Sequence, residues 1–556
     1  MALKILNLKY LPCRTARFAL RLGTNNKHDP VDNHFCGLGN NWSIIMTTFT
    51  RRQTLGLGAA AFVSGLLAGR LQVLAAETDT LTIAFNVNLP SFDPTVGASA
   101  VNPTIQAIYR SIFSQYVGQK PDLSFEPGIL TDWGWNEDKT KVWMDVREGA
   151  TWHDGSPVTP EDVVWSLERA ANPETGNPIQ FVWSTIGNFA IEGNKVTADV
   201  LRFEPTLFMW MAFLTGYVMP KAYYEKVGAE GFEKAPIGSG PYMVEEYEGN
   251  AFLKLKAYPG YYGDKPAFDT VIFKFVPDTT SRVAEIESGS SDVTLEIPYE
   301  EYDRLIAKPG LSGVAEPVSD IGMIFLNNID VMNDKNVRLA ANYAINKQAI
   351  IDRLLSGYGV PLDTLEAPEY SAFDPDIKVP YDPELAVKLL AESGYSVDNP
   401  VKFTIQTTRG LKPKDYEMIQ AIVGMWRKVG IDANIEVYEI AKHYELRAAD
   451  ELAPAAFYNW GNAIGDPTTS TGFAMFGPSP HSVWNTDDLD GMIGPLWGEM
   501  DEEKRIEGWK AVSKYIAEQG YVIPLLQYVQ PIVFKDTLTV TPNVSGALEP
   551  TLIAPK

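Results

Sequence analysis

The chain has 556 residues, of which 45% are hydrophobic and 21% are charged, so it is long enough to bury more than one core. Its 70 Asp and Glu residues outnumber its 47 Lys and Arg residues, which gives a formal net charge of −23. A surface this acidic repels nucleic-acid phosphates and anionic lipid headgroups, and we therefore exclude both as expected partners.

Residues 1–45 differ in composition from the rest of the chain. They hold six Lys or Arg, two Asp or Glu and both cysteines, Cys13 and Cys36, and they show no sustained hydrophobic periodicity. Met46 follows directly and would start a signal peptide of ordinary length. We interpret residues 1–45 as a doubtful N-terminal extension and exclude them from the fold.

The next segment, 50–69 (TRRQTLGLGAAAFVSGLLAG), is apolar and rich in glycine, which could indicate a dinucleotide-binding loop or a membrane span. Gly56, Gly58 and Ala61 have the spacing of a dinucleotide-binding loop, but such a loop needs a buried strand before it, and the preceding residues are polar and basic. A membrane span needs about 20 apolar residues, and this run is loosened by glycines and interrupted by Arg70. Neither interpretation fits the segment.

An export signal fits the same segment better. The basic start, the weakly apolar middle and the small residues at 73–77 are typical of a signal peptide, and Arg51 and Arg52 resemble the twin-arginine signal of the Tat exporter. We expect residues 46–76 to be a Tat-type signal peptide that is removed on export to the periplasm. The remainder contains no cysteine, so we expect no disulfide, no thiolate metal site and no lipoprotein anchor.

After residue 76 the chain alternates between predicted strands and predicted helices. Strands are expected at 81–87, 141–146, in two runs within 238–263, on both sides of a helix within 268–298, at 321–328, 401–409 and 431–440, with a short hairpin at 191–200. Helices are expected around 105–113, from Thr159 onward, at 336–357 and at 415–430. This alternation predicts an α/β fold with a largely parallel sheet, built from interleaved segments.

The segment around His153 and Asp154 resembles a catalytic motif but is better explained by structure. The sequence HDG predicts a turn, Thr159 is a good helix N-cap, and Pro160 suits the first helical position. We therefore interpret His153 and Asp154 as parts of a hydrogen-bonded corner.

The order of segments resembles the extracellular solute-binding proteins of family 5, the peptide, opine and nickel receptors of ABC importers. The resemblance extends over roughly residues 81–540, and its most specific piece is REGATWHDGSPVTPEDVVWSL at 147–167. Four further pieces occur in the order typical of the family: IGSGPYMVEEYE at 237–248, KNVRLAANYAINKQAII at 335–351, RKVGIDANIEVYE at 427–439 and WGNAIGDPTT at 460–469.

The resemblance implies a two-lobed periplasmic-binding-protein-like fold of type II, with an extra subdomain on lobe I and a ligand cleft between the lobes. The expected parts are lobe I at 77–315 with the subdomain at about 116–235, lobe II at 316–521, and a C-terminal return to lobe I at 522–556. The segments 321–328 and 521–530 are expected to be the hinge crossings.

The resemblance also implies a function without catalysis. Such a receptor, expected to be a monomer, binds peptides or oligopeptides by hinge closure and delivers them to a permease in the inner membrane. We expect no cofactor and no metal. Two alternatives stay open: a receptor for an opine, oligosaccharide or sugar phosphate, and a chaperone-like peptide holder that uses the same cleft.

An exported hydrolase is the alternative from another class. The five histidines, His28, His34, His153, His443 and His481, show no HExxH or other metal spacing. The sequence contains no GxSxG nucleophile turn before a helix and no Walker loop. The sequence therefore offers no nucleophile, metal cluster or cofactor loop for an enzyme.

Arg409 is the first candidate ligand contact. It ends the predicted strand at 401–409, and the resemblance implies that an arginine in this loop pairs with the ligand carboxylate. A guanidinium suits a carboxylate because it donates two parallel hydrogen bonds. The alternative is a solvated surface arginine.

The segment FYNWGNAIGDPTTS at 457–470 supplies further candidates. The resemblance implies an aspartate three residues after Trp460 that pairs with a ligand α-amino group, but this chain has Ala463 there. The departure puts α-amino recognition in doubt. Asp466 could substitute or simply start a turn before Pro467. Trp460 could stack on the ligand or belong to the core, and Tyr458 and Asn459 are expected near the cleft.

Polar residues at strand ends complete the candidate set. In open α/β sheets, ligands bind beside the carboxyl ends of the strands. Asn86, Asn88 and Ser91 follow the first predicted strand, and Asn327 ends the strand at 321–328. Each could face the cleft or cap a loop.

Overall fold

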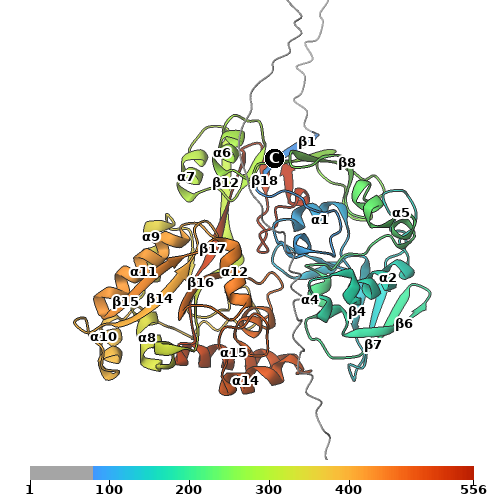
Figure 1. The fold of residues 1–556 in the computed structure, drawn as a ribbon. Helices are drawn as coiled ribbons and strands as arrows, with labels where there is room; N and C mark the ends of the chain where they lie inside the picture. The colour runs from blue at the N-terminus through green and yellow to red at the C-terminus, as the bar shows by residue number, and fades with distance from the viewer. Residues whose placement is uncertain (1–78) are drawn as a thin grey trace, which may run out of the picture. The chain divides into compact units, whose positions relative to one another are not determined.

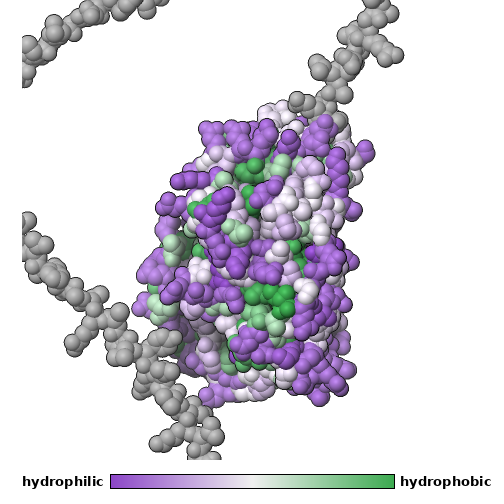
Figure 2. Space-filling model, turned by 90° about the vertical axis from the view of Figure 1, so that its right-hand side faces the viewer, coloured by the Kyte–Doolittle hydropathy of each residue, from purple (hydrophilic) through white to green (hydrophobic). Residues whose placement is uncertain are grey.

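The computed structural model describes residues 79–556. The predicted extension and signal peptide, 1–45 and 46–76, lie outside the described residues. Among the helices of 79–556, none is both long and apolar enough to cross a membrane. Figure 2 shows one face of this part of the chain: hydrophilic side chains cover most of it, and hydrophobic ones gather in small patches.

An 11-stranded sheet runs through the described residues in the order β15-β14-β16-β12-β17-β11-β1-β10-β9-β8, with β13 beside β17 (Figure 1). The bounds are β1 Thr80–Phe85, β8 Tyr242–Glu248, β9 Phe252–Ala257, β10 Thr270–Phe275, β11 Val293–Leu295, β12 Leu311–Leu326, β13 Val360–Pro361, β14 Val401–Thr407, β15 Ile431–Val437, β16 Ala455–Gly461 and β17 Val522–Lys535.

The prediction of a largely parallel sheet is wrong, because the sheet is mixed. Strand β1 pairs in parallel with β10 and β11, and β14 pairs in parallel with β15 and β16, but the other neighbours are antiparallel. Strands β8 and β9 are joined by a tight turn, and strands joined in this way have to run in opposite directions.

The two longest strands, β12 and β17, join two halves of the described chain. Residues 311–317 of β12 pair with β17 near β11, and residues 321–325 pair with the other end of β17, with a break in register between Pro317 and Ile321. We call residues 79–317 and 529–556 the first half and residues 321–527 the second half. The predicted boundary between residues 315 and 316 falls inside β12, and both predicted hinge segments reach this break.

Each half has its own hydrophobic core. The second-half core lies around Met323, Ile405 and Trp426. Its helices are α8 Lys335–Tyr343, α9 Lys347–Leu354, α10 Pro383–Glu392, α11 Asp415–Val429, α12 Ile440–Ala448, α13 Phe473–Met475, α14 Asp487–Ile493 and α15 Glu502–Gln519.

The first half contains two cores. One lies around Ile83 and Ile108. The other lies under a separate sheet with the order β4-β5-β7-β6, which falls within the predicted subdomain at 116–235. Its strands are β4 Leu130–Trp135, β5 Lys141–Val146, β6 Ile186–Glu192 and β7 Lys195–Val200; the helices of this half are α1 Gln106–Ile112, α2 Pro160–Ala171, α3 Gln180–Trp183, α4 Leu207–Met211, α5 Lys221–Lys234, α6 Thr279–Glu287 and α7 Tyr299–Ile306.

The corner at His153 is held by backbone hydrogen bonds. His153 Nδ1 accepts from the Gly238 N–H at 3.1 Å, so Nε2 carries the proton and donates to the Gly240 carbonyl at 3.2 Å. Burial lowers the pKa of His153 to about 4. Thr159 caps α2 in a capping box with Asp162, as its position in the sequence predicts.

The predicted helix at 336–357 is wrong as a single element, because it forms two helices, α8 and α9. The Asn346 side chain accepts a hydrogen bond from the Ala349 N–H at 2.9 Å and caps α9. An asparagine that bonds the backbone in this way favours a new helix start over continuation of the previous helix.

Candidate ligand-binding site

A cavity of about 440 Å³ lies between the two halves. Its walls combine aromatic rings and charged side chains, which come from the first half (Trp210, Phe213, Glu296) and the second half (Lys412, Arg447, Trp460). Cavities of about 300–1,000 Å³ with this mixture are typical of small-molecule sites.

The end of β16 forms much of the second-half wall. Trp460 and Asn459 both line the cavity. Trp460 Nε1 donates to the carbonyl oxygen of Thr469 at 2.6 Å, and Asn459 Nδ2 donates to Asp320 Oδ1 at 2.9 Å. These bonds hold two of the predicted candidates in fixed positions at the cavity.

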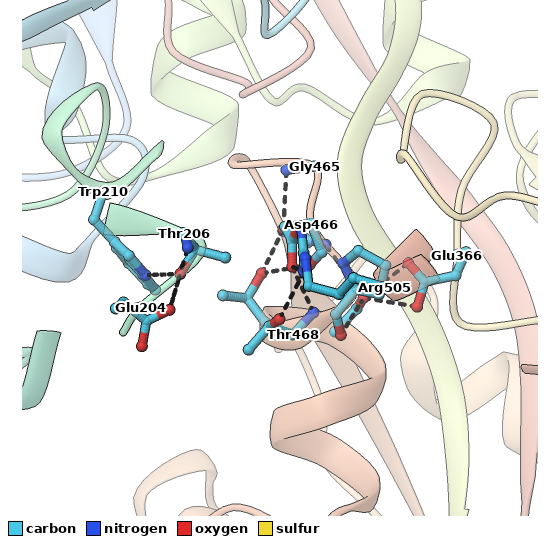
Figure 3. A network of polar contacts seen from close by, with 12 residues as sticks. Glu204, Thr206, Trp210, Glu366, Gly465, Asp466, Thr468 and Arg505 are labelled. Atoms are coloured by element: carbon cyan, nitrogen blue, oxygen red, sulfur yellow. Dashed lines mark hydrogen bonds and ion pairs between the residues drawn. The ribbon is translucent and has the colours of Figure 1, made fainter. Parts of the chain in front are cut away.

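The loop after β16 is anchored from behind by a buried polar network (Figure 3). Both carboxylate oxygens of Asp466 accept from Arg505, at 3.0 and 2.5 Å, and Asp466 is fully buried. Glu366 accepts from the hydroxyl groups of Ser470, at 2.9 Å, and Thr471, at 2.6 Å. Asp466 does not line the cavity but lies behind its wall, where the charge of Arg505 matches that of its carboxylate.

Ala463 lines the cavity and also joins the two halves. It is 5% exposed and, with Ile464, packs into the core of the first-half subdomain. Its carbonyl oxygen accepts from Gln119 Nε2 at 2.7 Å. The position where the family resemblance implies an aspartate is therefore occupied by a methyl group packed between the halves.

The facing wall is supported by a second hydrogen-bonded group (Figure 3). Trp210, at the cavity, donates from Nε1 to Thr206 Oγ1 at 3.1 Å, and this hydroxyl donates to Glu204 Oε1 at 2.6 Å. Burial raises the pKa of Glu204, and the Thr206 hydrogen bond opposes this rise. Each wall therefore has a tryptophan whose ring is fixed by a hydrogen bond.

Two carboxylates at the cavity already have partners. Asp320 forms an ion pair with Lys412, and Glu296 accepts from the Asn86 side chain. Burial tends to lower the pKa of Lys412, but the carboxylates of Asp320 and Glu296 together outweigh burial and leave that pKa raised. Asn86 does not line the cavity itself but holds Glu296, which does.

Arg409 lies at an adjoining cavity of about 540 Å³. This cavity shares Glu296, Asp320 and Lys412 with the first one. The Arg409 side chain is exposed, and its Cζ lies 3.6 Å from the centroid of the Tyr416 ring. The guanidinium thus lies beside the main cavity rather than in its wall.

The other sequence candidates have structural contacts away from the main cavity. Tyr458 is fully buried, stacks on His443 at a centroid distance of 4.1 Å and donates to the His443 carbonyl at 2.6 Å. Asn327 donates to the Leu452 carbonyl at 3.0 Å, and Ser91 donates to Glu233. Asn88 Oδ1 is buried without a partner among the described residues.

Sequence reasoning missed Arg447, which lines the cavity from α12. Its Cζ lies 5.2 Å from the ring centroids of Tyr444 and Tyr458 and 5.5 Å from that of Trp460. Tyr444 and Arg447 are three residues apart on a helix and therefore share a face, which is the signal that could have identified them. Within residues 79–556, no cluster of three or more His, Cys, Asp or Glu suits a metal ion.

Two α/β halves joined by two strands, with a cavity between them, define a two-domain solute-binding protein. The chain belongs to the bacterial extracellular solute-binding proteins of family 5, whose middle region matches residues 124–479.

Named relatives extend over most of the chain. It is 27% identical to a dipeptide-binding protein of Escherichia coli over 487 residues, covering 81% of this chain and 88% of the relative. It is 28% identical to the glutathione-binding protein GsiB of Salmonella paratyphi A over 502 residues, covering 86% and 94%. The structure of HbpA2 from Haemophilus parasuis superposes with a TM-score of 0.75 at 20% identity, covering 86% of this chain and all of that one, and so has the same fold.

Proposed function

We propose that this chain is the substrate-binding component of an ABC importer and that its ligand is a short peptide. The observation that carries the proposal is the cavity of about 440 Å³ lined by both halves. Relatives named as dipeptide-binding and glutathione-binding proteins support the peptide class. Members of the family are receptors, and we infer no catalysis for this chain.

Hinge closure follows from a ligand that contacts both walls. Such a ligand binds the closed arrangement more tightly than an open one, so its differential affinity shifts the population toward closure. The register break in β12 and β17 is the place where a few residues could absorb the change in angle. The closed receptor would then dock on a permease in the inner membrane, as a monomer.

Thermal unfolding of the purified protein with a pool of short peptides tests this function. A ligand that binds only the folded state stabilises it, by about 2.7 kcal/mol at one hundred times its dissociation constant. We expect a concentration-dependent rise in melting temperature. The absence of any rise with peptides, together with one for another solute class, would contradict the proposal.

Export to the periplasm through residues 46–76 belongs to the same proposal. The twin arginines support the Tat route. Replacing both, Arg51→Lys with Arg52→Lys, should leave an uncleaved precursor inside the cell, detectable by fractionation. Normal cleavage and export of this variant would contradict the Tat route.

A receptor for an opine, an oligosaccharide or a sugar phosphate is the second candidate. It is favoured by Ala463, which brings no carboxylate to the position where the family resemblance implies an α-amino contact. Native mass spectrometry of protein purified from its own host separates the candidates by the mass of the retained ligand.

A further inference from the structure

Arg447 brings a guanidinium to the cavity within a set of aromatic rings. The side chain is half-buried on α12, and its Cζ lies 5.2 to 5.5 Å from the ring centroids of Tyr444, Tyr458 and Trp460. Such rings stabilise a cation through their faces but accept few of its five N–H donors. The donor groups therefore still need acceptors.

No acceptor for Arg447 is present in the part of the chain that the structure describes. Its guanidinium forms neither a hydrogen bond nor an ion pair within residues 79–556. The buried arginines elsewhere behave differently, because each donates to a carboxylate or carbonyl oxygen: Arg110 to Glu549, Arg282 to Val276, Arg338 to Met332 and Arg505 to Asp466. A partly desolvated guanidinium without an acceptor is costly, so this one is poised for an acceptor from outside the chain.

The surroundings of Arg447 favour an anion. The carboxylates at the cavity already have partners, since Asp320 pairs with Lys412 and Glu296 accepts from Asn86. His481, which also lines the cavity, has a pKa lowered by burial and by the Arg447 charge. The Arg447 guanidinium thus carries a positive charge that no carboxylate among residues 79–556 pairs with.

We propose, building on the proposed peptide receptor, that Arg447 selects the ligand by binding its carboxylate while a planar part of the ligand lies against Trp460. A guanidinium and a carboxylate form two parallel charge-assisted hydrogen bonds, and the aromatic surroundings keep this pair partly out of water. Arg447 is then a specificity-determining residue of the cavity, at a different place from the arginine that the family resemblance indicates.

Arg409 is the competing cation, and the geometry does not favour it. It is exposed, lies over the Tyr416 ring at 3.6 Å and lines the adjoining cavity only. An exposed charge is screened by water and salt, so it discriminates weakly between an acid and its amide.

The test compares short peptides carrying a free C-terminal carboxylate with the same peptides carrying a C-terminal amide. Their dissociation constants are measured by isothermal titration on the wild type and on Arg447→Met, Arg447→Lys, Arg409→Met and Arg427→Met. Arg427 is the matched control, because it is an exposed arginine on α11 outside the cavity. Circular dichroism and melting temperature establish that each variant is folded.

We expect the wild type to bind the acids at least about tenfold more tightly than the amides. Arg447→Met should abolish this preference while still binding the amides, and Arg427→Met should retain it in full. Arg447→Lys keeps the charge without the planar fork, so it should weaken acid binding severalfold and leave amide binding unchanged. This second variant decides the matter if Arg447→Met does not fold.

Each remaining outcome contradicts a different statement. If Arg409→Met removes the preference and Arg447→Met retains it, Arg447 is not the selecting cation. If the wild type binds acids and amides equally, the receptor function stands and the role of Arg447 is overturned. If the wild type binds neither set, the peptide receptor itself is contradicted, and the role of Arg447 with it.

Discussion

The side-chain amide of Gln119 donates to the carbonyl oxygen of Ala463 at 2.7 Å, so the first half is hydrogen-bonded directly to the cavity wall of the second half. The Gln119 carbonyl oxygen in turn accepts from Arg110 Nη2 at 2.8 Å, which fixes the orientation of the amide. Because both residues are buried, this bond is shielded from water. It stabilises the arrangement in which both halves line the cavity.

Gln119→Glu should reduce the free energy of ligand binding by more than it reduces the free energy of unfolding. The variant keeps the acceptor for Arg110 but loses the donor for Ala463, which leaves a buried carbonyl facing a carboxylate. We expect affinity for the peptide that binds the wild type best to fall about fivefold or more, measured by isothermal titration.

Gln180→Glu is the control for this change. It removes a similar bond, from Gln180 Nε2 to the Ala171 carbonyl at 2.5 Å, that lies within the first half. Its affinity should match that of the wild type. Equal losses in both variants would show that the bond to Ala463 has no special part in binding.

Asp466→Asn should destabilise the protein strongly. Arg505 and Asp466 form an ion pair with side chains 3% and 0% exposed, and removing one charge leaves the other buried and unpaired. We expect the free energy of unfolding to fall by about 3–5 kcal/mol, measured by urea denaturation. Lys510 and Glu507 form an exposed pair, and there Glu507→Gln should change the free energy of unfolding by less than about 1 kcal/mol.

Glu366 should make stability depend on pH. Burial raises its pKa to about 7, although the hydroxyl groups of Thr471 and Ser470 oppose the rise. The folded protein keeps this proton up to about pH 7, whereas the unfolded chain releases it near pH 4.5. Its contribution to stability is therefore fully present below about pH 4.5 and is lost as the pH rises through 7, by at most about 3 kcal/mol.

Urea denaturation at pH 5 and pH 8 checks this dependence. Glu366→Gln should lose less stability than the wild type between the two pH values, because its amide does not ionise. Glu392→Gln, at an exposed position in α10, should show the same loss as the wild type. An unchanged loss in Glu366→Gln would mean that Glu366 is ionised in the folded protein at both pH values.

Local sequence signals predicted much of the fold. Thr159, Pro160 and the turn before them gave the start of α2, and the helix expected at 415–430 coincides with α11, which ends at Gly430 in the left-handed conformation. The hydrophobic alternation at 141–146 coincides with β5. Caps and periodicity are local properties, so they can be read from neighbouring residues.

Pairing direction and the charge partners of side chains could not be predicted in the same way. The mixed sheet depends on how β12 and β17 pair across long stretches of sequence: Phe325 pairs with Val522, 197 residues later, and Leu311 pairs with Lys535, 224 residues later. The sequence around Asp466 predicts a turn start or a ligand contact. Only the fold shows that α15 brings Arg505 beside this carboxylate. Arg447 shares a helical face with Tyr444, but the cavity that this face lines forms only when β16 brings Trp460 beside it.

Trp460 offers the most direct test of a solute site between the two halves. Isothermal titration of the purified protein with a pool of short peptides should show saturable binding of one ligand per chain. Trp460→Ala should weaken this binding more than about tenfold, whereas Trp143→Ala, which alters a tryptophan of β5 outside the cavity, should not. Undiminished binding in Trp460→Ala would contradict a ligand site in this cavity.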